Sequence, residues 1–371
     1  SPGIPLNIPI IQKARAWNKL ILSEIEFGFM IKDPELKIIA VTGSNGKSTT
    51  VCLIDHILRN GSINSAMGGN IGTAFTALPI ENGELDVVLL EISSFQLDLL
   101  RNFRPDVAVV LNITPDHLNR YENFEHYART KLSIFTNQRK GDLSIINMDD
   151  SVIRRFYKPG SSRLLGYSLQ EKADIYFQDG KIKADKFSIP VAEISLQGPH
   201  NMANVMAALL AVSVFDCEID YLRKALSSFS PLPHRLELIT RKRGITFIND
   251  SKATNTEAVK YALQSFPASI RIIMGGRGKG EDYSILNDFL QAKVIKAYLI
   301  GESREEMKRV FSPVVKVASY GDLADAVHAA YDEASSNEII LLSPACTSFD
   351  MFLNFEERGD CFRKIVEELK E

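Results

Sequence analysis

The sequence predicts an α/β protein in which a central parallel-sheet domain of the P-loop ATPase type precedes a C-terminal α/β domain of the Rossmann type. Short apolar runs typical of buried strands alternate with stretches of helical periodicity. Polar clusters follow these runs directly, as expected where ligands bind at the carboxyl edge of a parallel sheet. At 371 residues the chain exceeds what one hydrophobic core usually supports, so two or more domains are expected.

Three segments are predicted. Residues 1–33 contain one expected helix, Ile10 to Ile21 with Trp17, and are interpreted as the remnant of an N-terminal domain with its linker. Residues 34–231 form the expected central ATP-binding domain. Residues 232–371 form the expected C-terminal domain, because a proline-flanked loop precedes a new α/β pattern there.

Composition and charge exclude several classes of protein. A net charge of −3 gives no reason to expect a nucleic acid or an anionic membrane as partner. The sequence contains no run of about 18 apolar residues, which is the length that a membrane-spanning helix needs. The four cysteines form no C-x-x-C pair, which suits a reducing cytoplasm. A soluble protein of the cytoplasm is therefore expected.

The first strand-like run leads into a phosphate loop, GSNGKST. Its two glycines allow a tight turn with inward N–H groups, and the helix that follows adds its N-terminal partial charge. Lys47 would reach the β- and γ-phosphates of ATP, and Ser48 would bind Mg²⁺. The strict pattern has a glycine at position 41, so this is a shortened variant, and an ordinary glycine turn is the alternative. The predicted loop residues are Gly43, Ser44, Asn45, Gly46, Lys47, Ser48 and Thr49.

Two further strand-like runs end in polar residues. Leu85 to Leu90 leads to Glu91, and Val107 to Leu111 is followed by His117. Parallel strands would bring Glu91 and His117 to the same edge as Ser48. Hydroxyl, carboxylate and imidazole groups suit a Mg²⁺-nucleotide site. Taken singly, the carboxylate could cap a helix and the imidazole could be a polar turn residue.

The middle of the chain alternates between helix-like and strand-like segments. Residues 124–138 are predicted to form a helix with Lys131 on its mostly apolar face, where a side chain that snorkels to water is the alternative. Residues 141–147 and 163–196 are predicted strand regions. In a helix from Gly198 to Val212, Asn201 and Asn204 share a face and could contact a purine ring or cap the helix.

Four strand-like runs in the C-terminal part each end in a polar loop: residues 245–248, 270–274, 297–300 and 339–342. The sequence GGRGKG after the second run could form another phosphate loop, or a basic loop for a small anionic substrate. The chemistry-bearing residues of these loops are Asp250, Lys252, Thr254, Arg277, Lys279 and Ser348.

The order of motifs resembles that of the Mur ligases of bacterial cell-wall synthesis. The motifs are TGSNGKST, LEISSFQL, NITPDH, HNxxN, LPHRLE, NDSKATN and SPACTSFDxFxNFExRG. SSFQL, DSKATN and SPACTSFD resemble the branch that joins D-glutamate to UDP-N-acetylmuramoyl-L-alanine. The resemblance implies that ATP phosphorylates the substrate carboxylate, and that the D-glutamate amine then attacks the acyl phosphate. The family's UMP-binding first domain is almost wholly missing from this pattern.

The resemblance also implies roles for single residues. Lys47 would neutralise the transferring phosphoryl group, while Ser48 and Glu91 would hold one Mg²⁺. His117 and Lys131 would hold a second, with Lys131 carbamylated. The positions that match nucleotide contacts are Asn201, Asn204, Arg235, Asp250 and Lys252. The positions that match substrate contacts are Asn70 for the muramoyl substrate and Thr254, Lys279, Ser348 and Phe355 for D-glutamate, and Ser93 is a further expected substrate residue.

Two other interpretations stay open. A sister ligase, such as folylpolyglutamate synthase or the Mur enzyme that adds the third residue, shares the phosphate loop and HNxxN, although SSFQL and SPACTSFD argue against both. A nucleotide-binding module without ligase activity is the second. Substrates on two domains must meet, so closure about residues 230–234 is also expected.

Overall fold

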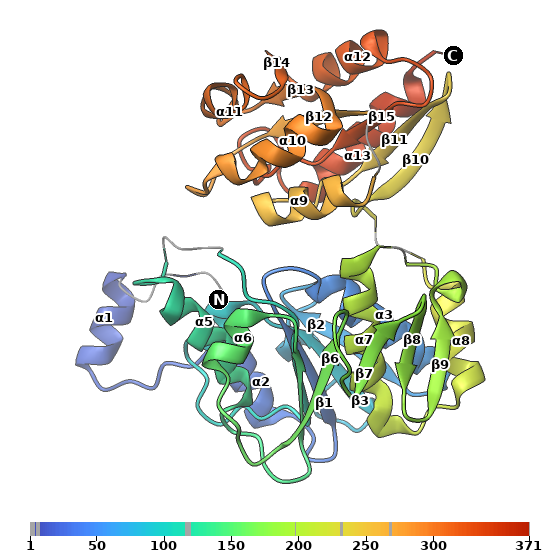
Figure 1. Ribbon diagram of the computed structural model, residues 1–371. Helices are drawn as coiled ribbons and strands as arrows, with labels where there is room; N and C mark the ends of the chain where they lie inside the picture. The colour runs from blue at the N-terminus through green and yellow to red at the C-terminus, as the bar shows by residue number, and fades with distance from the viewer. Residues whose placement is uncertain are drawn as a thin grey trace. The chain divides into compact units, whose positions relative to one another are not determined.

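The computed structural model describes residues 4, 8–115, 120–196, 198–230, 233–266 and 269–370. The chain divides into two compact units, Ser1–Ser230 and Pro231–Glu371 (Figure 1). Each unit is built around its own sheet, as predicted for an α/β protein.

The first unit contains a nine-stranded sheet in the order β2-β3-β1-β4-β5-β6-β7-β8-β9. In this order, all neighbouring strands from β2 to β7 pair in parallel. The strands β8 and β9 extend the sheet by antiparallel pairing. Val41 of β1 pairs with Glu91 of β3, so the carboxyl ends of these strands lie side by side. The strands are β1 (Lys37–Thr42), β2 (Ser65–Gly69), β3 (Val87–Glu91), β4 (Val107–Val110), β5 (Leu143–Asn147), β6 (Arg163–Ser168), β7 (Ile175–Gln178), β8 (Lys181–Ala184) and β9 (Phe187–Pro190).

Helices cover both faces of this sheet. The α-helices are α1 (Pro9–Ala16), α2 (Glu24–Ile31), α3 (Lys47–Asn60), α4 (Ser94–Leu97), α5 (Phe124–Leu132), α6 (Ser151–Phe156), α7 (Pro199–Val212) and α8 (Ile219–Ser228). The 3-10 turns are η1 (Phe75–Ala77), η2 (Ser133–Phe135), η3 (Val191–Glu193) and η4 (Ser213–Phe215). The described part of the chain has no helix that is long and apolar enough to span a bilayer.

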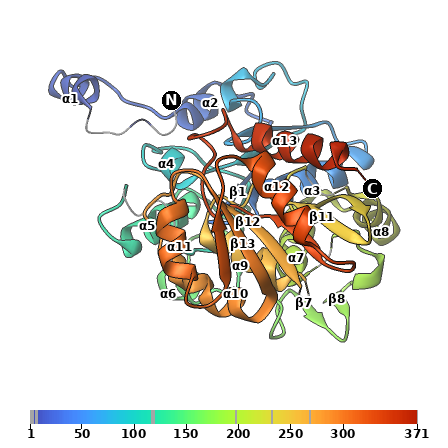
Figure 2. The same cartoon turned by 90° about the horizontal axis from the view of Figure 1, so that it is seen from above.

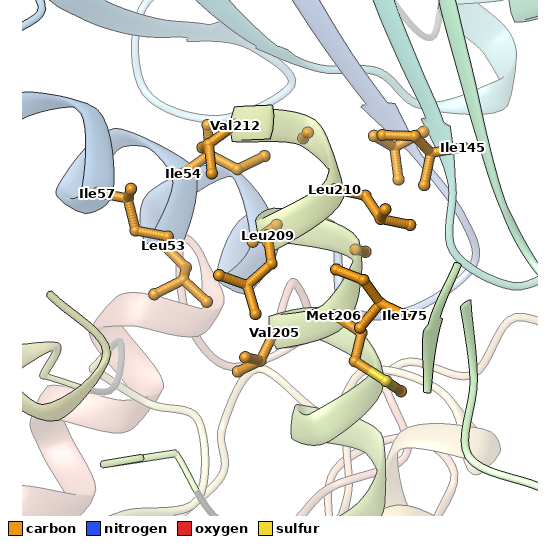
Figure 3. Close-up of a cluster of buried hydrophobic side chains, with 14 of the residues drawn as sticks. Leu53, Ile54, Ile57, Ile145, Ile175, Val205, Met206, Leu209, Leu210 and Val212 are labelled. Atoms are coloured by element: carbon orange, nitrogen blue, oxygen red, sulfur yellow. The ribbon is translucent and has the colours of Figure 1, made fainter. Parts of the chain in front are cut away.

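Successive side chains of β1 point to opposite faces of the sheet and join two different hydrophobic cores. Ile39 and Val41 join the core under α3, α7 and α8, whereas Ile38 and Ala40 join the core under α2, α5 and α6. In Figure 3, one side of α7 faces α3 and its other side faces Ile145 of the sheet. The helix α7 is therefore apolar nearly all round, and its polar residues are concentrated in the first two turns, next to the phosphate loop.

The second unit contains a six-stranded sheet in the order β10-β11-β15-β12-β13-β14, in which only β10 is antiparallel to its neighbour. The helices α10 and α11 lie on one side of the sheet, and α12 and α13 lie on the other (Figure 2). The strands are β10 (Glu237–Lys242), β11 (Ile245–Asn249), β12 (Ile270–Gly275), β13 (Val294–Ile300), β14 (Lys316–Ser319) and β15 (Ile339–Leu342). The helical elements are α9 (Thr256–Gln264), η5 (Tyr283–Leu286), α10 (Asn287–Lys293), α11 (Arg304–Phe311), α12 (Leu323–Glu333) and α13 (Phe355–Glu368).

Two helix predictions were wrong in extent. The helix expected from Ile10 to Ile21 ends at Ala16, because Asn18 adopts a left-handed conformation with φ 50°. The helix expected over 124–138 ends at Leu132 and continues only as the turn η2. The helix α2 was missed, although Ser23 caps it by accepting a hydrogen bond from the backbone of Glu26 at 3.1 Å.

Candidate active site

The phosphate loop joins β1 to α3 and requires glycine at two positions. Gly43 has φ 155° and Gly46 has φ 89°, a region in which side chains are strained. A Cβ atom on Gly46 would lie 2.4 Å from Oδ1 of Asn204. The missing side chain therefore allows α7 to bring Asn204 against the loop. Asn204 in turn donates a long hydrogen bond of 3.5 Å to Asn201.

The connection after β4 holds the loop in shape. The side-chain oxygen of Asn112 accepts a hydrogen bond from the Asn45 backbone at 2.8 Å, and its amide donates to the Asn45 carbonyl at 3.0 Å. The Ser44 hydroxyl donates to the Thr114 carbonyl at 2.9 Å. Sequence reasoning missed Asn112, although it is the first asparagine after a predicted strand. These contacts fix the loop backbone before any ligand binds.

The polar side chains of the loop fit a bound polyphosphate. The Lys47 ammonium group donates to the carbonyls of Gly43 and Ser44 at 2.8 and 3.0 Å, which holds the charge against the loop. The Thr49 hydroxyl is buried at the start of α3 and has no hydrogen-bond partner within the described residues. A buried donor without a partner is costly, and a phosphate oxygen would satisfy it.

Three predicted residues from separate segments meet at the end of β3. The Glu91 carboxylate is buried, and its Oε2 accepts a hydrogen bond from the Ser48 hydroxyl at 2.6 Å. Its Oε1 accepts a hydrogen bond from the Asn70 amide at 2.9 Å. The hydroxyl and carboxylate oxygens are hard donors of the kind that Mg²⁺ prefers. The described residues hold no group of three or more His, Cys, Asp and Glu side chains suited to a metal, and His117 lies outside them.

Lys131 lies beside the phosphate loop and not at the surface. Its side chain is only 2% exposed, so the interpretation that it snorkels to water was wrong. Its amine donates to the Gly43 carbonyl at 2.9 Å and lies 5.0 Å from the centre of the Tyr127 ring. Helix α5 therefore brings a buried amine to the same edge as Glu91 and Ser48.

The predicted substrate residue Ser93 caps the N-terminus of the short helix α4. The backbone N–H of Ser93 donates to Oε1 of Gln96 at 2.9 Å. The Gln96 amide nitrogen is buried, and no hydrogen-bond partner for it occurs in the described ranges. This makes Gln96 a candidate ligand-contacting residue that sequence reasoning missed. Its signal was the Ser-x-x-Gln capping pattern within SSFQL.

The second unit has its own polar edge after β11. The Asp250 carboxylate accepts hydrogen bonds from the Ser343 hydroxyl at 2.8 Å and from the Leu236 backbone at 3.2 Å. Burial raises the pKa of Asp250 from its ordinary value of 3.8 to about 7, while the hydrogen bond from Ser343 and the charge of Arg235 act in the opposite direction. An acid that titrates near neutrality is common in functional sites.

The remaining predicted residues of the second unit lie in the neighbouring loops. The Lys252 ammonium lies 4.8 Å from the centre of the Phe355 ring, and the Thr254 backbone donates to the Lys252 carbonyl at 2.9 Å. Ser348 is buried and Lys279 is half-buried. Arg277, considered for the same anionic role as Lys279, forms a surface ion pair with Glu302 at 2.9 Å.

A fully buried arginine joins two of these loops. Nε of Arg358 donates to the Ser251 hydroxyl at 2.9 Å, and Nη2 donates to the carbonyls of Ser251 and Cys346 at 2.8 and 3.1 Å. Burial lowers the pKa of Arg358 to about 10. Sequence reasoning quoted its motif, NFEERG, without assigning this residue a role.

A hollow of about 640 Å³ lies elsewhere in the first unit. Its lining includes Pro34 and Asp106, which precede β1 and β4. It is therefore at the amino edge of the sheet, opposite the phosphate loop, and is not part of the candidate site.

Two family models match most of the chain. The Mur ligase middle domain matches residues 41–212, and the Mur ligase glutamate ligase domain matches residues 234–346. A UDP-N-acetylmuramoylalanine–D-glutamate ligase of Salinibacter ruber is 40% identical over 387 aligned residues, which cover all of this chain and 84% of that protein. One of Cytophaga hutchinsonii is 41% identical over 380, with coverage of 100% and 84%.

Solved structures support the fold. The MurF ligase of Thermotoga maritima in complex with ADP has a TM-score of 0.72 at 20% identity, covering 93% of this chain and 83% of that one. FolC of E. coli in complex with ADP has a TM-score of 0.70 at 18% identity and covers 99% of both chains. At these identities the likeness concerns the fold.

Proposed function

The chain belongs to the Mur ligase family, and we propose that it is an ATP-dependent, ADP-forming ligase that joins D-glutamate to UDP-N-acetylmuramoyl-L-alanine for peptidoglycan precursor synthesis. The observation that carries the proposal is the Glu91 carboxylate, which binds both Ser48 of the phosphate loop and Asn70 of the connection after β2. One side chain thus links the expected ATP-binding and acceptor-binding residues. The names of the relatives supply the identity of the acceptor and the amino acid.

The reaction must make a carboxylate electrophilic. The acceptor carboxylate attacks the γ-phosphorus of ATP, the bond to ADP breaks, and an acyl phosphate forms. The amine of D-glutamate then attacks the acyl carbon, loses a proton, and phosphate leaves the tetrahedral intermediate. The loop N–H groups and Lys47 bind the phosphates and oppose their charge. Ser48 and Glu91 would hold Mg²⁺, which supplies further neutralisation of the phosphate oxygens.

Lys131 would act as a carbamate. A free lysine amine with an ordinary pKa of about 10.4 is cationic and would repel a nearby metal ion. Addition of CO₂ to the neutral amine releases a proton and leaves an anionic oxygen ligand. The burial of the amine beside Gly43 supports this role, because a buried cation is costly and the neutral amine is the form to which CO₂ adds. His117 would belong to the same second metal site.

The family resemblance assigns roles to the remaining residues. Asn201 and Asn204 of the first unit and Arg235, Asp250 and Lys252 of the second would contact the nucleotide. The D-glutamate pocket would use Thr254, Lys279, Ser348 and Phe355. Residues 34–231 would form the ATP-binding domain, preceded by residues 1–33, and residues 232–371 would form the C-terminal domain. We further propose that the protein is a monomer in the bacterial cytoplasm. Size-exclusion chromatography would test the monomeric state.

Mass detection of the amide product tests the proposed function. The chain is incubated with ATP, Mg²⁺ and UDP-N-acetylmuramoyl-L-alanine together with D-glutamate, L-glutamate or a diamino acid, and in a parallel reaction with ATP, Mg²⁺, a folate and L-glutamate. Product with D-glutamate alone is the expected result. Product with another amino acid or with folate would indicate a sister ligase. ATP binding without any product would favour the nucleotide-binding module.

A further inference from the structure

Helix α2 carries a buried carboxylate that no role described so far explains. Glu26 is fully buried, and its two oxygens accept three backbone hydrogen bonds from consecutive residues. These come from Arg101, Asn102 and Phe103, at 2.9, 2.8 and 3.0 Å. A charged acceptor with several backbone donors is a strong arrangement. It fixes the end of the connection between β3 and β4.

A second carboxylate of the same helix fixes the connection between β2 and β3. Oε1 of Glu24 accepts hydrogen bonds from the backbone and the hydroxyl of Thr76, at 2.6 and 2.8 Å. The helix also packs closely here, because a Cβ atom on Gly28 would lie 2.4 Å from the ring of Phe75. One helix is therefore bonded to both connections that flank β3.

Short paths lead from these anchors to the acceptor residues. On one side, the turn containing Asn70 is closed by a hydrogen bond from Gly69 to the Thr73 carbonyl at 3.0 Å, three residues before Thr76. On the other side, the Leu100 backbone donates to the Leu97 carbonyl at 3.3 Å, which joins the Glu26 contacts to the end of α4. Only short, hydrogen-bonded segments therefore connect α2 with Asn70 and with α4.

We infer that α2 positions the acceptor side of the site, with Glu24 and Glu26 as positioning residues for Asn70 and for the helix α4, which Ser93 caps. The inference rests on the proposed function, in which Asn70 is an acceptor-binding residue; Ser93 is a further predicted substrate residue. The phosphate loop is held by Asn112 from the connection after β4. Loss of the α2 carboxylates therefore weakens acceptor binding and spares ATP binding.

The test compares Michaelis constants for the two substrates in four variants. Glu26→Ala raises the KM for UDP-N-acetylmuramoyl-L-alanine about tenfold, since small misplacements of binding groups are costly, and leaves the KM for ATP within about twofold. Glu26→Gln falls between Glu26→Ala and the parent, because its amide oxygen still accepts. Glu24→Ala also raises the KM for the acceptor selectively. Because Glu24 is partly exposed, this variant remains informative even if Glu26→Ala does not fold.

Glu338→Ala is the matched control, because it removes a carboxylate bonded to Arg271 at 2.6 Å in the second unit. It should lower stability without a selective change in the KM for the acceptor. Equal shifts in both Michaelis constants, or no shift in an active Glu24→Ala protein, would overturn the inference. Absence of any product from the parent chain would refute the proposed function, and the inference with it.

Discussion

Replacing Asp250 by asparagine should stabilise the second unit at alkaline pH. The carboxylate is buried, and its pKa lies at about 7 in the folded protein compared with an ordinary value of 3.8. The folded protein therefore binds more protons than the unfolded chain between these two values. The contribution of Asp250 to stability falls as the pH rises through this window and is lowest above pH about 7.

The size of the effect follows from the shift. A difference of about three pKa units corresponds to about 4 kcal/mol of unfavourable free energy for the ionised form. Asparagine avoids this cost, but it cannot accept from both the Ser343 hydroxyl and the Leu236 backbone, which costs about 1–2 kcal/mol. We expect Asp250→Asn to be more stable by about 2 kcal/mol at pH 8, with no gain at pH 5.

Urea denaturation at both pH values, followed by a probe in the second unit, measures this difference. Asp149→Asn is the matched control, because this carboxylate accepts the same kinds of donor, the Ser168 hydroxyl at 2.5 Å and the Leu169 backbone at 2.7 Å, in the first unit. A variant at Asp250 that is destabilised equally at pH 5 and pH 8 would refute the reasoning. Its ligase activity should fall, because the proposal places Asp250 at the nucleotide.

Three further predictions concern the phosphate loop and Lys131, which lies beside it. Lys47→Ala should lower kcat by about 10²–10³ with little change in melting temperature, because a preorganised charge is lost at the phosphates; a loss below tenfold would contradict its role. Gly46→Ala should abolish ATP binding in calorimetry and destabilise the first unit, because its Cβ would lie 2.4 Å from the Asn204 oxygen; ATP affinity equal to the parent's would show that the loop tolerates a side chain. Lys131→Ala should remove activity and its dependence on bicarbonate, with partial recovery by added short carboxylic acids; full activity that ignores CO₂ would exclude the carbamate.

The phosphate loop and its strand could be predicted because they depend on local sequence. The glycines, Lys47 and Ser48 lie within seven residues, and β1 is a short apolar run bounded by polar residues. The meeting of Ser48 with Glu91 was also predictable, since parallel strands align their carboxyl ends whatever the intervening sequence. In the structure, Val41 of β1 pairs with Glu91 of β3, and the side chains of Ser48 and Glu91 lie together as expected.

Other features depend on contacts that no local pattern specifies. Glu26 in sequence looks like a solvated acid in the first turn of a helix, and only tertiary packing brings the backbone of residues 101–103 to it. Arg358 was hidden for the same reason, because its partners Ser251 and Cys346 are 107 and 12 residues away in the sequence. The burial of Lys131 was underestimated because helical periodicity gives the face of a residue but not the depth of the surrounding structure.

Transfer of isotope from the acceptor to phosphate tests the central claim most directly. The chain is incubated with ATP, Mg²⁺, D-glutamate and UDP-N-acetylmuramoyl-L-alanine labelled with ¹⁸O in its carboxylate, and the released phosphate is analysed by mass spectrometry. An acyl phosphate pathway predicts phosphate carrying a single ¹⁸O atom, formed only when D-glutamate is present and in step with the amide product. Unlabelled phosphate, or release that is independent of D-glutamate, would contradict the account.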